Sequence, residues 1–233
     1  MIQFELNRAR SGAVMNRVPS LEYVSVSKDA YDFLKHMLFG AWNSIYVAAS
    51  ERAYRDICRT LRNIRQTDTN STKLRSEIDI LLEQEICALL DRGIANQKQY
   101  DEWHEKLCLR IRKHYHDNGF EMTIGQAQKW VNMTMKYLFI ADAPGMVDAF
   151  YFCHVPIDSY IINAAEEQLA LKRPVLPWSK IDSYKEYAKY QQQIRMLLSN
   201  IAPLEWEFKT WITMAVDKKE AKHTRRAEQE MKK

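Results

Sequence analysis

The stretch MTIGQAQKWVNMTMKYLF, residues 122–139, gives the clearest indication of how this chain folds. Thr123 and Gln126 match the capping box T-x-x-Q, in which the two side chains bind free amides at a helix start. We therefore expect a helix that begins near Ile124. Its apolar side chains recur at helical spacing, at Ala127, Trp130, Val131, Met135, Leu138 and Phe139.

The opposite stripe of this helix carries Gly125, Lys129, Asn132 and Lys136. Lysine is rarely buried without a partner, so this position predicts a solvent-exposed Lys129. A chemical interpretation stands beside it. The partial positive charge at a helix start disfavours an ammonium, so a partly desolvated lysine there loses its proton more readily, as a nucleophilic amine must.

Helical patterns on both sides of this stretch predict an all-α protein. Ser27 is the candidate N-cap of the first helix. The polar segment 66–72 predicts a loop, and residues 1–26 show no helical period and predict an arm with one or two short strands. We expect helices within residues 28–42, 43–65, 73–93, 96–119, 159–168 and 179–200, and from residue 203 onward.

Composition is that of a globular protein and leaves the partner open. The chain has 233 residues, of which 46% are hydrophobic and 27% charged, enough for one domain with its own core. A formal net charge of +4 permits a polyanionic partner without requiring one. Basic residues cluster within 52–65 and 217–233, although a charged terminal helix is usually solvated surface.

The cysteines indicate a reducing compartment. Their spacing contains no C-x-x-C pair and suits neither zinc nor an iron–sulfur cluster, so we expect free thiols, no metal and no cofactor. The chain has no long apolar segment, which predicts a cytoplasmic protein without a membrane partner. The four cysteines are Cys58, Cys87, Cys108 and Cys153.

A second informative stretch is CHVPIDSYIINA, residues 153–164. Asp158 follows a proline-marked turn and fits the N-cap position of the next helix, which is worth about 1 kcal/mol of stability. The same position would fix a carboxylate at the mouth of a helix, where it can stabilise positive charge or accept a proton. Asp158 is therefore either a capping residue or one member of a working pair with Lys129.

The motifs IGQAQK and VPID, in this order, resemble the core pattern of the helix-hairpin-helix (HhH-GPD) DNA glycosylases. The chain looks most similar to the 8-oxoguanine DNA glycosylase branch, over roughly residues 100–170. The gap of 29 residues between Lys129 and Asp158 is nearest to the archaeal type, with residues 141–150 as the extra length. Ala127 stands where the family usually has a second glycine, and no cluster cysteines follow, which excludes the iron–sulfur subgroup.

This resemblance implies a two-lobed helical fold with a cleft, the lobes being residues 27–95 plus 180–233 and residues 96–179. It implies an enzyme, a DNA N-glycosylase with or without AP-lyase activity. Lys129 would attack the sugar of a flipped nucleotide and form a Schiff base, and Asp158 would stabilise the developing positive charge. The partner would be double-stranded DNA with an oxidised or otherwise modified base, bound by a monomer near the nucleoid in base-excision repair or anti-phage defence.

Six further residues are candidates for contacting DNA. The amide of a glycine at the helix start would hold a phosphate, glutamines would read a base edge, and aromatic rings would stack or face the cleft. Alternatives remain open, because a tryptophan or histidine here can equally belong to the core and a glutamine can cap the helix. The candidates are Gly125, Gln126, Gln128, Trp130, His154 and Trp178.

Two readings compete with a glycosylase. One is a non-catalytic helical module that binds DNA or a protein on the same scaffold. The other is an unrelated all-α interaction domain in which the two motifs are coincidental. Covalent trapping on DNA, and salt-sensitive binding to it, distinguish the three.

Overall fold

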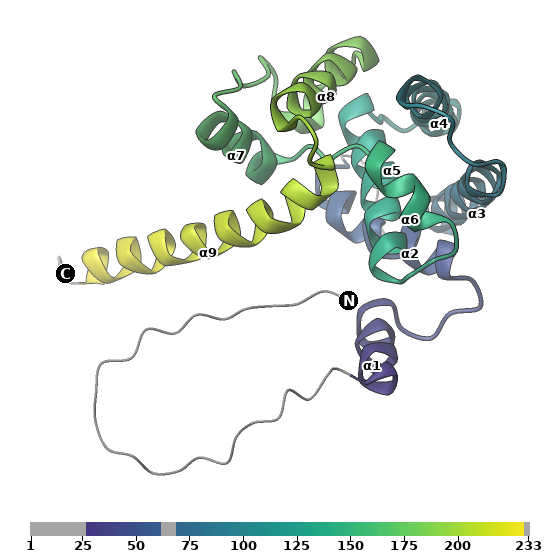
Figure 1. Ribbon diagram of the computed structural model, residues 1–233, viewed down its shortest axis with the longest axis horizontal. Helices are drawn as coiled ribbons and strands as arrows, with labels where there is room; N and C mark the ends of the chain where they lie inside the picture. Colours follow the sequence, from purple (N-terminus) through teal and green to yellow (C-terminus); the bar gives the residue numbers. More distant parts are fainter. Residues whose placement is uncertain (1–26, 62–68, 231–233) are drawn as a thin grey trace.

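The computed structural model describes residues 27–61 and 69–230, with side chains described as far as residue 216 (Figure 1). Throughout these two ranges the regular secondary structure is helical and contains no strand, which confirms the all-α class for this part of the chain. The expected N-terminal arm, residues 1–26, lies outside the described residues.

The described ranges form α-helices joined by short 3₁₀ turns. The α-helices are α1 Lys28–Phe39, α2 Ile45–Ile57, α3 Thr69–Arg92, α4 Gln97–Asp117, α5 Ile124–Ile140, α6 Met146–Ala149, α7 Ser159–Leu169, α8 Tyr184–Leu198 and α9 Pro203–Glu230. The 3₁₀ turns are η1 Cys58–Thr60, η2 Phe150–Phe152 and η3 Trp178–Lys180.

Several expected boundaries are confirmed and others are wrong. Thr123 caps α5 through the complete capping box with Gln126, as its sequence predicts. The expected loop over residues 66–72 is wrong from Thr69 onward, because α3 begins there. The helix expected within 43–65 ends at Ile57 and continues only as η1 up to Thr60, among the residues that can be described.

Helix α5 lies in the middle of the molecule and is buried around its whole circumference. It packs against α2 and α4, and also contacts η3, α6 and α8. In Figure 1, α3 and α4 lie on one side of it and α7 and α8 on the other. The expectation that Lys129 is solvent-exposed is therefore wrong: the residue is 7% exposed, because neighbouring elements cover the polar stripe as well as the apolar one.

The main core joins α3 and α4 to this central helix. The apolar side chains of α3 that recur at helical spacing are buried, except Leu81, which is half-buried. Each aliphatic side chain removed from water contributes about 1.5–3 kcal/mol. The buried members of the α3 stripe are Leu74, Ile78, Leu82, Ile86 and Leu89.

Helix α9 forms part of the wall beside α5 before it extends away from the other helices (Figure 1). Pro203 starts the helix at a position where its missing N–H costs nothing. Gln168 on α7 holds the first half, because its Oε1 accepts hydrogen bonds from Trp206 Nε1 at 3.0 Å and Thr210 Oγ1 at 3.1 Å. This docking orients Glu207 and Trp211 toward the space beside α5.

Helix α2 packs against α5 across the expected boundary between the two lobes. The division into residues 27–95 plus 180–233 and residues 96–179 stays a prediction. Within the described ranges, no helix combines the length and apolar character needed to cross a membrane.

Candidate functional site

Lys129 and Asp158 meet in the structure. The lysine Nζ lies 2.6 Å from Asp158 Oδ2, and the two side chains are 8% and 12% exposed. The capping box fixes where α5 begins and so sets the direction of Lys129 in the second turn. Asp158 is the N-cap of α7, so each member of the pair stands near the start of its helix.

The two oxygens of Asp158 have different partners. Oδ1 accepts hydrogen bonds from the backbone amides of Tyr160 at 2.8 Å and Ile161 at 3.0 Å, while Oδ2 faces Lys129. The capping interpretation and the paired interpretation therefore describe the same carboxylate. Because the cap immobilises the group, Oδ2 is held in a fixed direction toward the amine.

The pair borders a pocket of about 750 Å³. Pockets that hold small ligands typically measure about 300–1,000 Å³ and are mostly apolar, with a few placed polar groups. This pocket has that character, since aromatic and aliphatic side chains surround two lysine–carboxylate pairs. Its lining is Leu38, Arg52, Asp56, Arg59, Thr60, Lys129, Met133, Lys136, Tyr137, Ile140, Asp158, Ser159, Tyr160, Trp178, Glu207, Phe208, Trp211 and Ile212.

Trp178 stands over Lys129 and lines the pocket. Its ring centroid lies 5.0 Å from Lys129 Nζ, within the range of a cation–π contact. At Gly125 the backbone of η3 packs directly against α5. A Cβ atom at this position would stand 1.8 Å from the Trp178 carbonyl oxygen. The glycine is required for this approach.

The expected phosphate contact at Gly125 is not supported by this geometry. Its amide donates a hydrogen bond to the Ile181 carbonyl at 2.7 Å, so the N–H is already used within the chain. The backbone of η3 occupies the space that a phosphate would need. The structure gives Gly125 a packing role in place of the expected anion-binding one.

A second lysine–carboxylate pair lines the same pocket. Lys136 Nζ lies 2.6 Å from Glu207 Oε2, with side chains 11% and 1% exposed. The rings of Phe208 and Trp211 surround this ammonium, with centroids 4.8 and 5.9 Å from it. Burial raises the pKa of the Glu207 carboxyl, and Lys136 opposes that rise. Lys136 lies on the same stripe of α5 as Lys129, and their spacing of seven residues is the signal that both face one site.

The two candidate glutamines are engaged in the protein interior. Gln126 completes the capping box and donates from Nε2 to the Thr60 carbonyl at 2.7 Å. Gln128 is 1% exposed and donates from Nε2 to the carbonyls of Gly125 at 2.8 Å and Ile157 at 3.1 Å. Neither lines the pocket, so the expectation that they read a base edge is not supported by their positions.

Trp130 and His154 also belong to the interior. Trp130 is fully buried and donates from Nε1 to the Ser50 carbonyl at 3.1 Å. His154 is 3% exposed, with its ring nitrogens 2.9 Å from the Tyr187 hydroxyl and from Asp101 Oδ1. The core alternatives left open by the sequence are the ones that the structure shows, because neither residue borders the pocket.

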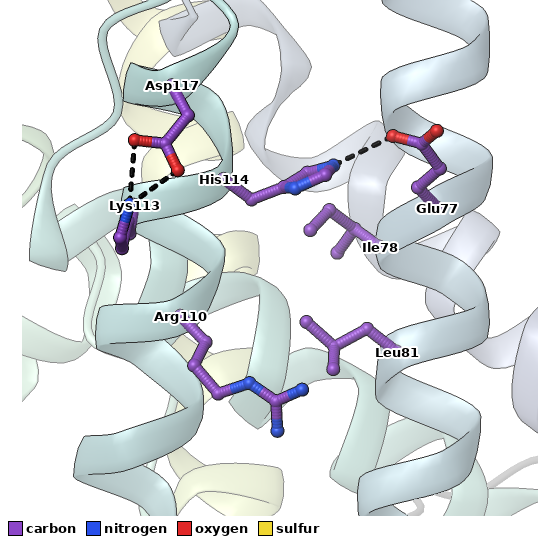
Figure 2. Close-up of a pocket in the computed structure, with 7 residues that line it drawn as sticks. All are labelled: Glu77, Ile78, Leu81, Arg110, Lys113, His114 and Asp117. Carbon is purple, nitrogen blue, oxygen red and sulfur yellow. Dashed lines mark hydrogen bonds and ion pairs between the residues drawn. The ribbon is translucent and has the colours of Figure 1, made fainter.

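A smaller pocket lies between α3 and α4, away from the pair (Figure 2). Its charged side chains already have partners: His114 with Glu77 at 2.8 Å, and Lys113 with Asp117 at 2.6 Å. Arg110 is paired with Glu85. The pocket that contains Lys129 is larger, at about 750 Å³ against about 340 Å³, and its lysine–carboxylate pairs are buried, so it is the better candidate for a functional site.

No family model matches the chain, and no curated protein or solved structure matches it either. The four cysteines are free thiols. Across the described ranges, no group of three or more His, Cys, Asp or Glu side chains is arranged to hold a metal ion. The groups that line the site are amines, guanidinium groups, carboxylates, hydroxyls and aromatic and aliphatic side chains.

Proposed function

We propose that this protein is a lysine-dependent DNA glycosylase that removes a modified base from a flipped nucleotide. The observation that carries the proposal is the 2.6 Å contact between Lys129 and a capped Asp158 at the edge of the 750 Å³ pocket. Support also comes from the resemblance of IGQAQK and VPID to the HhH-GPD glycosylases. The two-lobed arrangement of that superfamily belongs to the same proposal.

The chemistry begins with a proton transfer. The Lys129 amine must be unprotonated to attack, and Asp158 Oδ2 is the acceptor in contact with it. The Nζ lone pair then forms a bond to the anomeric carbon while the bond to the base breaks. The base leaves with the electron pair of that bond and takes the proton that Asp158 had accepted, which restores the carboxylate. The sugar ring oxygen then takes a proton from the bound amine as the ring opens. Opening of the sugar gives a positively charged Schiff base beside the Asp158 carboxylate, which stabilises it.

The pocket suits a planar, polar ligand. A base must leave the DNA stack before an enzyme can act on its sugar, and flipped bases are read by stacking and by hydrogen bonds to their edges. Trp178 and Trp211 offer rings for stacking, and the Lys136–Glu207 pair presents a donor beside an acceptor. Oxidised guanine and a modified base of foreign DNA both fit this description, so repair and anti-phage defence remain two versions of the proposal.

Covalent trapping tests the proposal. Borohydride reduces a Schiff base to a stable amine, so incubation with a duplex containing an abasic site should yield a protein–DNA adduct. Lys129→Gln should abolish the adduct, because an amide cannot attack the sugar. Lys113→Gln is the matched control, since this exposed lysine on α4 is remote from the pocket.

The outcome separates the candidate functions. No adduct, together with salt-sensitive DNA binding, would replace the enzyme with a non-catalytic DNA-binding module. No DNA binding at all would favour an interaction domain with coincidental motifs. If the adduct forms, mass spectrometry of the bases released from a panel of damaged and phage-modified DNAs identifies the substrate.

A further inference from the structure

We propose that Gln128 and Asn132 form a clamp that positions Asp158 by holding the backbone of residues 155–157; this inference rests on the proposed function. Consecutive residues on α5 pair with consecutive residues before α7: Gln128 with Ile157, and Lys129 with Asp158. The two contacts together fix the position of Asp158 relative to Lys129. Gln128 and Asn132 are positioning residues, since neither touches the pocket.

The first half of the clamp is Gln128, which binds both backbone groups of the residue before Asp158. Its Nε2 donates to the Ile157 carbonyl at 3.1 Å, and its Oε1 accepts from the Ile157 amide at 3.4 Å. An amide side chain is suited to this double contact, because it carries a donor and an acceptor side by side. A rotation of the backbone before Asp158 would break both bonds.

The second half is Asn132, which fixes the direction of Gln128. Its Nδ2 lies 2.9 Å from Gln128 Oε1 and 3.2 Å from the Val155 carbonyl, and its Oδ1 lies 2.9 Å from His104 Nε2. Burial holds the pKa of His104 well below its usual value, so the neutral ring donates its single N–H from Nε2 to Asn132. Asn132 is fully buried and has one orientation that satisfies these partners.

Behind the clamp, the network continues to Asp101. The Tyr187 hydroxyl lies 2.9 Å from Asn132 Nδ2 and 2.9 Å from His154 Nδ1. His154 Nε2 lies 2.9 Å from Asp101 Oδ1. Burial lowers the pKa of His154, so its neutral ring accepts from Tyr187 and donates to Asp101. The links from Tyr187 through His154 to Asp101 therefore each have a defined donor and acceptor.

This network is a costly way to fill a core. A buried polar group that loses its partner destabilises the folded state, whereas apolar side chains of similar size would fill the space without that risk. A fully satisfied network, in return, specifies one geometry. Here the specified geometry is that of the segment leading into Asp158, which accounts for a polar cluster in the centre of an otherwise apolar helix interface.

The test compares two buried variants on α5. Gln128→Met keeps the volume and removes the clamp, whereas the control Thr134→Val removes a buried hydrogen bond to the Trp130 carbonyl that does not involve residues 155–158. We measure the single-turnover rate of adduct formation at saturating abasic DNA, its pH profile, and the melting temperature. Gln128→Met should slow the reaction about 10- to 100-fold and shift the pH profile, because a displacement of about 1 Å can cost that much.

Each outcome decides the inference. If Gln128→Met reacts at the rate and with the pH profile of Thr134→Val, the clamp is only structural and the inference is overturned. If Gln128→Met does not fold, Tyr187→Phe removes one hydroxyl from the network and should still slow the reaction; an unchanged rate overturns the inference. If the unaltered protein forms no adduct, the proposed function is overturned, and the inference about the clamp is overturned with it.

Discussion

Asp158 carries two interactions on one carboxylate, and asparagine separates them. Asparagine is as good an N-cap as aspartate, so Asp158→Asn should keep the bonds that Oδ1 accepts from Tyr160 and Ile161. It should lose the charge that faces Lys129 and the ability to accept its proton. We expect adduct formation to fall by about 100-fold or more while DNA affinity persists.

Single-turnover trapping and a binding titration measure these two quantities. Asp117→Asn on α4 is the control, because this carboxylate is exposed and lies in the pocket of Figure 2. Undiminished trapping by Asp158→Asn would reduce this aspartate to a cap.

Lys136 should be important for stability as well as for the site. Lys136→Met leaves Glu207 buried without its cation, which costs about 3–5 kcal/mol at neutral pH. Burial already raises the pKa of the Glu207 carboxyl, so in acid this group is protonated in the folded state and the loss of Lys136 costs little. The cost in stability grows as pH rises through the raised pKa of Glu207. Urea unfolding at pH 8 and pH 5 measures the difference.

The double variant Lys136→Met with Glu207→Leu should recover most of the lost stability, since it removes both charges. A single variant as stable as the unaltered protein at pH 8 would contradict the assignment of this pair as buried.

For Asp79 we predict a dependence of stability on pH that is opposite to that of an ordinary surface carboxylate. Burial raises its pKa from 3.8 to about 6, although a hydrogen bond from Ser50 opposes the rise. The folded state therefore binds a proton more tightly than the unfolded state, so stability falls as pH rises from about 4 to 6 and stays lower above that. Asp79→Asn should stabilise the protein by about 1–3 kcal/mol at pH 8 and hardly at all at pH 4.

Thermal unfolding across this pH range measures the effect, with Asp117→Asn again as an exposed control. Equal stabilisation at both pH values would show that the effect is not electrostatic.

Local sequence predicted the helix starts well, because caps act within a few residues. Thr123 with Gln126, and Asp158, were readable as caps and are caps in the structure. Burial of Lys129 was not readable. Periodicity identifies the most apolar face of a helix, but it does not count the neighbours that cover the other faces, and α5 is enclosed by elements from both directions along the chain.

Gly125 should show how strongly η3 depends on its close contact with α5. In Gly125→Ala the new methyl would stand 1.8 Å from the Trp178 carbonyl, so the turn must move. We expect a loss of about 1–3 kcal/mol in the free energy of unfolding, typical of overpacking. Adduct formation should slow as well, because Trp178 would leave its place over Lys129.

Urea unfolding and trapping measure the two effects. Unchanged values in both would mean that η3 is not held by this contact. The sequence places a glycine at the start of α5 but does not show which segment packs against it, since η3 follows more than fifty residues later.

The pocket is a product of the whole chain. Its polar groups come from α2, η1, α5, the start of α7 and α9. Neither the Lys136–Glu207 pair nor the aromatic side chains of the pocket could therefore be assigned from any one segment. The partners in that pair stand 71 residues apart. For Lys129 and Asp158, in contrast, two short sequence motifs predicted that the residues form a pair.

For the proposed glycosylase, the charge around the pocket predicts which cations contact DNA. Arg59 lines the pocket and Arg55 lies one turn earlier, and both are exposed. Each cation that neutralises a DNA phosphate releases counterions, so the double variant with glutamine at both positions should lower the slope of log affinity against log salt by about two. Arg110→Gln, in the separate pocket of Figure 2, is the control and should leave the slope unchanged.

Binding titrations over a series of salt concentrations give the slope. An unchanged slope for the double variant would direct the search for the DNA surface to another face of the molecule.

The division of labour between the two oxygens of Asp158 has a consequence for mutational libraries. A screen for protein abundance and a screen for activity would both reject most substitutions at this position, for different reasons. The abundance screen reports on the start of α7, and the activity screen reports on the contact with Lys129. The two screens should disagree at asparagine, which a folding screen tolerates and an activity screen does not. This disagreement would show that Asp158 has a role in catalysis as well as in folding, which substitutions rejected by both screens would not reveal.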